Sequence, residues 1–368
     1  MNLLDYLKPP KLDSYQLKKS EFFNSINTFK DIADDQIDLS QVEVAMLGVP
    51  FARDNSYHPD FVDSVRYELS ELAAFQNKTH ILDAGNLIQG QTLNDSLTAL
   101  KDVITYFHNH NVFVITISKL ELVQKIFIES LKDEKRIKVA EVAPKFDLYE
   151  TLEYLTQSRL EQLHYTNIGY QSYYIHQEKF NWLNENSFDA YRLGVVRKNL
   201  SGIEPAIRDS LLINISLNAL KHTDAPGQKE FSPNGLYSEE ICQIAKYAGI
   251  ADYLKLANIS GFSENSEITT IKLIAQIIWF IIEGYGIRVT EDPTKDLYIK
   301  KFNVNTGGTD SIVFYKSDKT ERWWIEVPIR GNWPFIIPSS YKDYIEACNQ
   351  QIPERFLKAM QRYNFKPY

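Results

Sequence analysis

Polar side chains follow a strand-like apolar run in the stretch from Leu211 to Ser238. Residues Leu211 to Leu220 are apolar and partly alternating, which predicts a buried strand, and the loop after them is rich in Pro, Gly and Asn. Open α/β sheets bind their ligands at the carboxyl ends of such strands. The candidate site residues are Ser216 and Asn218 at the strand end, with His222 and Asp224 in the loop as candidate pocket residues.

The spacing of positions 216 and 218 is suited to metal binding, but their side chains are not. Alternate residues of a strand point to the same side, so two carboxylates here could bridge a pair of metal ions. A hydroxyl and a neutral amide stand at these positions instead. Neither supplies the anionic oxygen that screens two divalent cations held about 3.5–4 Å apart.

Three further apolar runs end near polar or charged positions. They are Val112 to Ile117, Ile137 to Val142 and Leu254 to Ile259. Lys119 follows the first run, Ala143, Lys145 and Asp147 follow the second, and Asn258 lies within the third. A lysine ammonium has three donors and no acceptor, so it cannot replace the carboxylate or imidazole ligands that hard cations choose.

The order of these strands and loops resembles the ureohydrolase family of arginases, agmatinases and formimidoylglutamases. The resemblance begins at Val44 to Pro50, which ends in Gly-Val-Pro, and continues at Ile81 to Asn86, which ends in Asp-Ala-Gly-Asn. It covers most of the chain. It implies a three-layer α/β/α sandwich around a mainly parallel sheet, two manganese ions at the strand ends, and hydrolysis of a guanidino or formimino C–N bond.

The resemblance also implies which positions correspond to the metal ligands. Only Asp147 keeps a ligand side chain, while the degenerate positions hold Lys119, Ala143, Lys145, Ser216, Asn218 and Asn258. We predict that one of the two lysine ammonium groups pairs with Asp147, because both lysines follow strands that end beside the vacated charge. The alternative is that Lys119 starts an exposed helix and Lys145 is an ordinary loop residue.

The run Ile168-Gly169-Tyr170-Gln171 ends another strand and resembles a Bacteroidetes-type branch of the family. Ordinary members have an arginine where this chain has Gln171. Gln171 is therefore a third candidate pocket residue, and the resemblance implies that substrate recognition has changed together with metal binding.

Helical and strand-like segments alternate along the chain, which predicts an α/β sandwich with a mainly parallel sheet. We divide the chain into an N-terminal arm over residues 1–39, the α/β domain over 40–290 and a C-terminal extension over 291–368. The extension is predicted to be a β-hairpin from Ser311 to Pro328, followed by helices near Ile337 to Tyr344 and Ile352 to Phe356.

Two adjacent tryptophans, Trp323 and Trp324, lie in the second strand of the predicted hairpin. Neighbouring residues of a strand point to opposite faces, so one indole can pack on the α/β domain while the other forms a partner surface. The alternative is that the last helices cover both.

Composition narrows the functional classes. The 368 residues carry a net charge of -8, and the basic residues are scattered, which argues against nucleic-acid binding. The most apolar run, Ile268 to Ile282, contains Lys272 and Gln276 and is short for a span, so a buried core helix is expected rather than a membrane helix. The start lacks an apolar signal segment, which favours a cytoplasmic protein.

The leading functional hypothesis is a metal-free, catalytically inactive ureohydrolase-like protein that needs no cofactor and acts as a binding or scaffold component, with another protein or a second copy as partner. One alternative is a manganese-dependent hydrolase of a guanidino or formimino C–N bond. A second is a small-carboxylate sensor that uses Lys119 and Lys145.

Overall fold

The computed structural model describes most of the 368-residue chain. The described residues are 3–11, 22, 25–28, 39–52, 56–76, 79–118, 122–131, 136–149, 163–263, 267–307, 311–329 and 333–364. Lys119 lies outside them, so its predicted role stays untested.

A ten-stranded sheet forms the centre of the described chain, in the order β1-β4-β3-β5-β10-β9-β6-β7-β8, with β2 paired to β4. All described pairs in it are parallel except β1 with β4. The strands are β1 (Leu7–Lys8), β2 (Asn27–Thr28), β3 (Val44–Val49), β4 (Ile81–Leu87), β5 (Phe113–Ser118), β6 (Ile137–Val142), β7 (Leu163–Tyr170), β8 (Asp189–Arg192), β9 (Leu212–Ser216) and β10 (Leu256–Ser260).

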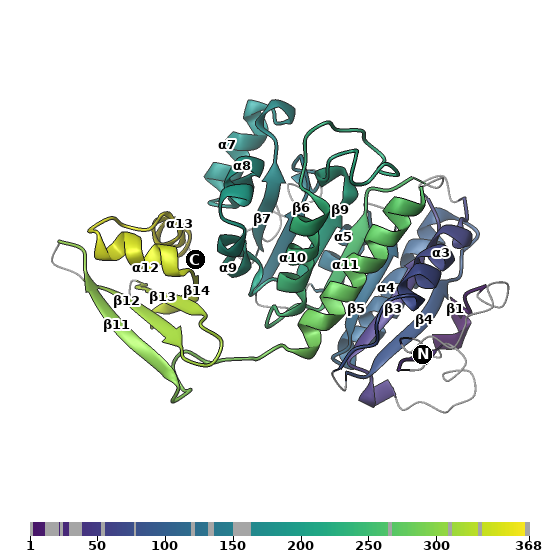
Figure 1. Ribbon diagram of the computed structural model, residues 1–368, viewed down its shortest axis with the longest axis horizontal. Coiled ribbons are helices and arrows are strands. Elements are labelled where there is room, and N and C mark those ends of the chain that lie inside the picture. The colour runs from purple at the N-terminus through teal and green to yellow at the C-terminus, as the bar shows by residue number, and fades with distance from the viewer. Residues whose placement is uncertain are drawn as a thin grey trace.

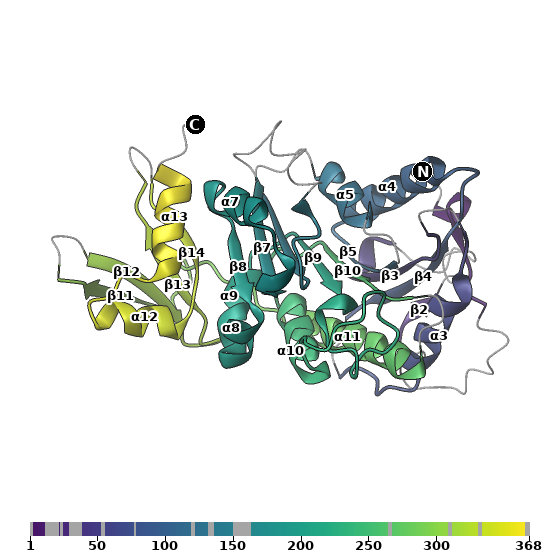
Figure 2. The ribbon, with the colours of Figure 1, turned by 90° about the horizontal axis from the view of Figure 1, so that it is seen from above.

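Helices cover both faces of this sheet, which gives the predicted three-layer sandwich (Figures 1 and 2). Figure 2 shows one layer above the sheet, formed by α4 (Leu93–Asn109), α5 (Leu122–Ser130) and α7 (Gln177–Glu185). The other layer contains α3 (Pro59–Ser70), α8 (Leu193–Lys198), α10 (Ser238–Gly249) and α11 (Ile268–Gly286), with the short α9 (Glu204–Ile207) beside them. Two buried apolar clusters, one on each face, fill the space between layers.

Helix α11 is long and apolar enough to cross a membrane by length and composition alone. In the structure it lies over the sheet between α3 and α10, and half of its apolar window is buried (Figure 1). Gly249 of α10 and Gly284 of α11 let the two helices approach closely, since a Cβ built on Gly249 would lie 2.2 Å from the carbonyl oxygen of Ile281. The helix is therefore a core element, as its sequence indicated.

A buried ion-pair network joins helix α3 to the end of β4, where the sequence reads Asp-Ala-Gly-Asn. The Arg66 guanidinium of α3 donates to Asp83 of β4 at 2.9 Å and to the side-chain oxygen of Asn86 at 2.7 Å. It also pairs with Asp63, at 2.9 Å. Asp83 and Asn86 of the Asp-Ala-Gly-Asn strand end therefore have a structural role, because they hold α3 on the sheet.

The C-terminal extension is larger than the predicted hairpin. It is a four-stranded antiparallel sheet in the order β11-β12-β13-β14, with two helices. Its elements are β11 (Ile299–Asn305), β12 (Ser311–Ser317), β13 (Trp323–Val327), β14 (Phe335–Ser339), α12 (Tyr341–Cys348) and α13 (Glu354–Asn364). The hairpin over β12 and β13 is as expected, but the predicted helix start at Ile337 was wrong, because 335–339 pair with β13.

The two tryptophans do point to opposite faces, and both are buried. The Trp323 ring stacks on Tyr344 of α12, with 4.6 Å between ring centroids. Trp324 faces the α/β domain, where the Arg208 guanidinium lies 5.0 Å from its ring. Their exposed fractions are 7% and 4%, so the expectation that one of them forms a partner surface was wrong.

Candidate functional site

The carboxyl ends of β5, β10, β9, β6 and β7 lie side by side in the sheet, so the structure brings the predicted site positions to one edge. One row of polar residues crosses all five strands at the same register, just inside this edge. Its members are Thr116, Asn258, Asn214, Glu141 and Asn167.

The first half of this row is hydrogen-bonded within itself. The Thr116 hydroxyl donates to the Asn258 side-chain oxygen at 2.7 Å, and the Asn258 amide donates to Asn214 at 2.8 Å. The Ser260 hydroxyl donates to the same Asn214 oxygen at 3.0 Å. Asn258 is fully buried, so each of these bonds satisfies a polar group that has no access to water. The Asn258 side chain is therefore used in hydrogen bonds within the sheet.

Small side chains occupy the next level toward the edge. Ser118, Ser216 and Ser260 are buried at the ends of β5, β9 and β10. Gly261 follows with φ of +78°, and a Cβ there would lie 2.5 Å from the Ser216 hydroxyl. The backbone after β10 therefore closes over Ser216, and Ala143 at the end of β6 is likewise buried.

The loop after β9 folds back over this edge. Asn218 is 5% exposed, and its side-chain oxygen accepts the backbone N–H of Glu230 at 2.9 Å. The Lys145 ammonium donates to the Glu230 carboxylate at 2.5 Å. Although burial opposes it, this contact raises the pKa of Lys145, with a smaller contribution from Asp147. The ion pair of Lys145 is therefore with Glu230. The prediction that one of the two lysines pairs with Asp147 stays untested, because Lys119 lies outside the described residues.

His222 and Asp224 have different surroundings in this loop. The Asp224 carboxylate accepts the backbone N–H and the hydroxyl of Ser238, at 2.8 and 2.9 Å, where α10 begins. Asp224 thus fixes a helix start, where a negative charge is favourable. The His222 ring packs on Phe231, with 4.7 Å between centroids, and its buried Nδ1 makes no hydrogen bond to a described residue.

Gln171 is 3% exposed and follows β7. Its amide donates to the backbone oxygen of Asn234 at 3.0 Å, and its side-chain oxygen accepts the Tyr173 hydroxyl. It therefore links the loop after β7 to the loop after β9 and holds Tyr173 in place.

The second half of the polar row contains a buried carboxyl that no sequence motif indicated. Glu141 of β6 is fully buried and accepts the Tyr165 hydroxyl. Burial raises the pKa of Glu141 to about 8, and the Asp147 carboxylate adds to this effect. The Asn167 side-chain oxygen makes no hydrogen bond to a described residue. A proton on Glu141 therefore suits this position better than a charge.

These side chains do not fit a two-manganese centre. Among the described residues there is no group of three or more His, Cys, Asp and Glu side chains that could hold a metal ion. At the edge itself, Lys145 presents only donors, and the Asn218 and Asn258 oxygens already accept hydrogen bonds.

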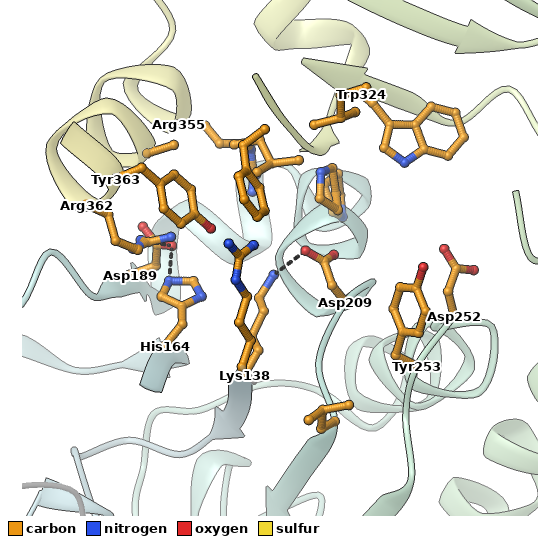
Figure 3. A pocket seen from close by; sticks show the side chains of 18 of the residues that line it. Lys138, His164, Asp189, Asp209, Asp252, Tyr253, Trp324, Arg355, Arg362 and Tyr363 are labelled. Carbon is orange, nitrogen blue, oxygen red and sulfur yellow. Dashed lines mark hydrogen bonds and ion pairs between the residues drawn. The ribbon is translucent and has the colours of Figure 1, made fainter. Parts of the chain in front are cut away.

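A separate cavity of about 490 Å³ lies at the opposite, amino ends of the strands, between the α/β domain and the extension (Figure 3). Lys138 near the start of β6, His164 near the start of β7 and Asp189 at the start of β8 line one wall. Residues of β14 and α13 line the other, including Phe335 and Arg355. Sequence reasoning missed this cavity, because its lining residues are far apart along the chain.

At one end of the cavity, His164 and Asp189 form an interaction network with Arg362. His164 Nε2 lies 2.9 Å from Asp189, which also pairs with Arg362 of α13 at 3.3 Å (Figure 3). Burial lowers the pKa of His164 to about 3, and the Arg362 charge adds to this effect, so the imidazole is neutral near pH 7. The network joins the extension to the sheet.

Comparisons with known proteins agree with this architecture. No protein-family model matches the sequence, and no curated protein matches it. Among solved structures, a Trypanosoma cruzi formiminoglutamase with Mn²⁺ is similar with a TM-score of 0.62 and 14% identity, over 68% of this chain and 96% of that chain.

Two further structures give the same result. Bacillus subtilis formimidoylglutamase has a TM-score of 0.59 and 14% identity, over 67% of this chain and 88% of its own. Thermoplasma volcanium agmatine ureohydrolase has a TM-score of 0.56 and 17% identity, over 68% and 92%. Described residues of β3 to β10 follow the sandwich that the sequence predicted. The chain therefore has the same fold as these ureohydrolase structures.

Proposed function

We propose that this chain is a member of the ureohydrolase family that works by binding a protein partner rather than by metal-dependent hydrolysis. The proposal rests on one observation: the side chains at the expected ligand positions already form hydrogen bonds within the protein. Asn258 is bonded to Thr116 and Asn214, and Asn218 accepts the Glu230 N–H. Neutral groups that satisfy one another leave no anionic oxygen pair for bridged cations.

The surface over this edge supports a binding role. Three aromatic side chains on the loops after β7 and β9 are exposed, and we call them the aromatic rim: Tyr173 at 61%, Phe231 at 73% and Tyr237 at 43%. Aromatic residues combine a large apolar area with low conformational freedom, which is why they are enriched at protein interfaces.

Local contacts hold the rim in place. Tyr173 donates to Gln171, and Phe231 packs on His222. The guanidinium of Arg197 lies 4.2 Å from the Tyr237 ring centroid. A surface held in this way loses little conformational entropy when a partner covers it, and this favours affinity.

The test is affinity capture from native lysate with matched baits. The first is the wild type, the second carries Tyr173→Ser and Phe231→Ser, and the control carries Trp333→Ser, which removes an aromatic that is 91% exposed in the extension. We expect one stoichiometric partner on the wild type and the control, and its loss from the rim variant. Equal capture by all three baits, or no stoichiometric partner, would contradict the proposal.

Activity measurements separate this proposal from the hydrolase alternative. Arginine, agmatine and formiminoglutamate are offered to the protein with added Mn²⁺. We expect no release of urea or formamide above the rate without protein, whereas metal-dependent turnover would establish the hydrolase.

A further inference from the structure

The cavity between the α/β domain and the extension contains charged side chains that lack hydrogen-bonding partners. Its volume of about 490 Å³ falls within the range of small-molecule sites, about 300–1,000 Å³. Its walls include apolar side chains from both parts of the chain, such as Leu163, Tyr253, Phe335, Ile337 and Tyr363. Size and lining are those of a ligand site rather than a packing defect.

Lys138 and Arg355 face this cavity from opposite walls (Figure 3). The Lys138 ammonium lies 3.5 Å from Asp209, and Arg355 Nε lies 3.4 Å from Asp343. Neither cation donates a hydrogen bond to a described residue, and the Arg355 Nε is buried. Their side chains are 15% and 17% exposed, so water reaches them only in part. A buried donor such as the Arg355 Nε is costly unless an acceptor satisfies it. The Lys138 ammonium, whose one carboxylate neighbour is 3.5 Å away, can take a further acceptor from the cavity.

The acidic residues of the lining do not supply that acceptor. Asp189 is committed to His164 and Arg362, and Asp252 accepts from Arg322 at 2.8 Å. Glu291 accepts the hydroxyls of Ser317 and Thr320. Asp209 faces Lys138 through one oxygen, at 3.5 Å, and its other oxygen is buried without a hydrogen bond to a described residue.

Arg136 adds a third cation to the lining. Its guanidinium lies over the Phe335 ring, 3.5 Å from the centroid, and 5.4 Å from that of Tyr363. It makes no ion pair with a residue in the described ranges. The cavity thus holds three cations whose donors are not fully used, Lys138, Arg355 and Arg136, against one such carboxylate, Asp209.

We propose that this cavity binds a small organic oxyanion, a carboxylate or a phosphate, whose anionic group lies between Lys138 and Arg355. A hydroxyl or ammonium group of the same ligand donates to Asp209. Charge-assisted hydrogen bonds to both cations give the anionic group its affinity, and the apolar walls contact the carbon skeleton. This site is at the opposite end of the strands from Lys145, so it is independent of the aromatic rim and of the proposed protein partner.

The test measures thermal unfolding of the full chain with inorganic phosphate as the probe, in place of chloride at constant ionic strength. We expect a saturable rise in melting temperature for the wild type, because a ligand that binds only the folded state stabilises it. Lys138→Met and Arg355→Met should each weaken phosphate binding about tenfold. Lys300→Met is the matched control, since this exposed lysine of β11 lies outside the cavity lining.

Asp209→Asn gives the opposite sign and excludes misfolding as an explanation. Removal of the carboxylate charge that faces Lys138 should tighten phosphate binding several-fold, because it no longer repels the anion or competes for the ammonium. A wild type without a saturable response, or variants that all respond as the wild type does, would overturn the proposal.

Glucose 6-phosphate and gluconate then identify the anionic group, with glucose as the neutral control. One of the two anions should bind more tightly than inorganic phosphate, because its hydroxyls can reach Asp209. If neither does, the organic part of the proposal is wrong and the site is one for inorganic anions.

Discussion

The two ends of the parallel strands carry polar residues of different kinds. At the carboxyl end, Asn258, Asn214 and Thr116 are neutral and bonded to one another, and the Lys145 ammonium meets Glu230. At the amino end, Lys138 and Arg355 are charged, face a cavity and lack hydrogen-bonding partners in the described chain. At the carboxyl end, where the family resemblance predicted metal ions, the polar groups satisfy one another. At the amino end, the charged groups face the cavity of the proposed anion site.

This difference shows why a fold does not define an activity. The sheet places these strand ends side by side whether or not they carry ligands, because the apolar clusters that stabilise it lie on its two faces and not at its edge. Function depends on the few side chains at an edge, and these can change without disturbing the core.

The substitution that should reduce stability most is one that breaks the neutral hydrogen-bond network at the carboxyl end. Asn258→Leu leaves the Thr116 hydroxyl without its acceptor and removes a donor from Asn214, both of which are buried. We expect a loss of about 3 kcal/mol in the free energy of unfolding, measured by urea denaturation. Asn303→Leu on the exposed part of β11 is the control, and an equal loss there would contradict this explanation.

The next largest effect is a pH dependence of folding stability that is caused by Glu141 in the same polar row. Burial raises the pKa of Glu141 from 4.5 to about 8, so the folded state binds one more proton than the unfolded state between these values. Stability contributed by the protonated carboxyl is complete below pH 4.5 and is lost as the pH rises toward 8.

Glu141→Gln should remove this dependence. A glutamine can accept from Tyr165 and offer an N–H to the unsatisfied Asn167 oxygen. Relative to the variant, the wild type should lose about 2 kcal/mol between pH 6 and pH 7.5, followed by urea denaturation at each pH. Glu239→Gln, at an exposed position, should leave the wild-type slope unchanged. Parallel curves for the wild type and the Glu141 variant would exclude a protonated Glu141.

At the amino end of the strands, His164 gives stability the opposite pH dependence. Burial lowers the pKa of His164 from 6.5 to about 3, so its contribution is complete above pH 6.5 and is lost as the pH falls through this window. His164→Gln keeps a donor for Asp189 without the titration. Between pH 6.5 and 5.5 the wild type should lose about 1 kcal/mol more than the variant, and an equal loss would show that the imidazole is not held neutral.

The smallest effect is expected at the Lys145 contact. Its side chain is 34% exposed and that of Glu230 is 52% exposed, so water and salt screen the pair. Lys145→Ala should change stability by less than about 1 kcal/mol. A double-mutant cycle with Glu230→Ala measures the coupling, and a value of several kcal/mol would mean that this ion pair holds the edge together.

The sandwich could be predicted from the sequence because its strands are apolar runs at strand length with helical segments between them. The helix start at Ile337 was misassigned, because Pro338 resembles a helix start. Pro338 is tolerated in β14 because this strand lies at the edge of the extension sheet. The helix begins only after Ser340, which caps it together with Asp343.

The candidate site could be predicted in part. The residues at the strand ends could be identified from the sequence. The partner of Lys145 could not, because only the fold of the loop after β9 brings Glu230 to it. The cavity was not predictable either. Lys138, Asp209 and Arg355 meet only because the extension packs on the amino ends of the strands, and no sequence spacing encodes that contact.

The most direct test of the central claim is elemental analysis of the purified protein after incubation with manganese and desalting. The engagement of Asn218 and Asn258 within the protein predicts that no manganese remains bound. Retention of one or two equivalents would contradict the account, and it would mean that the carboxyl end still assembles the metal centre of a hydrolase.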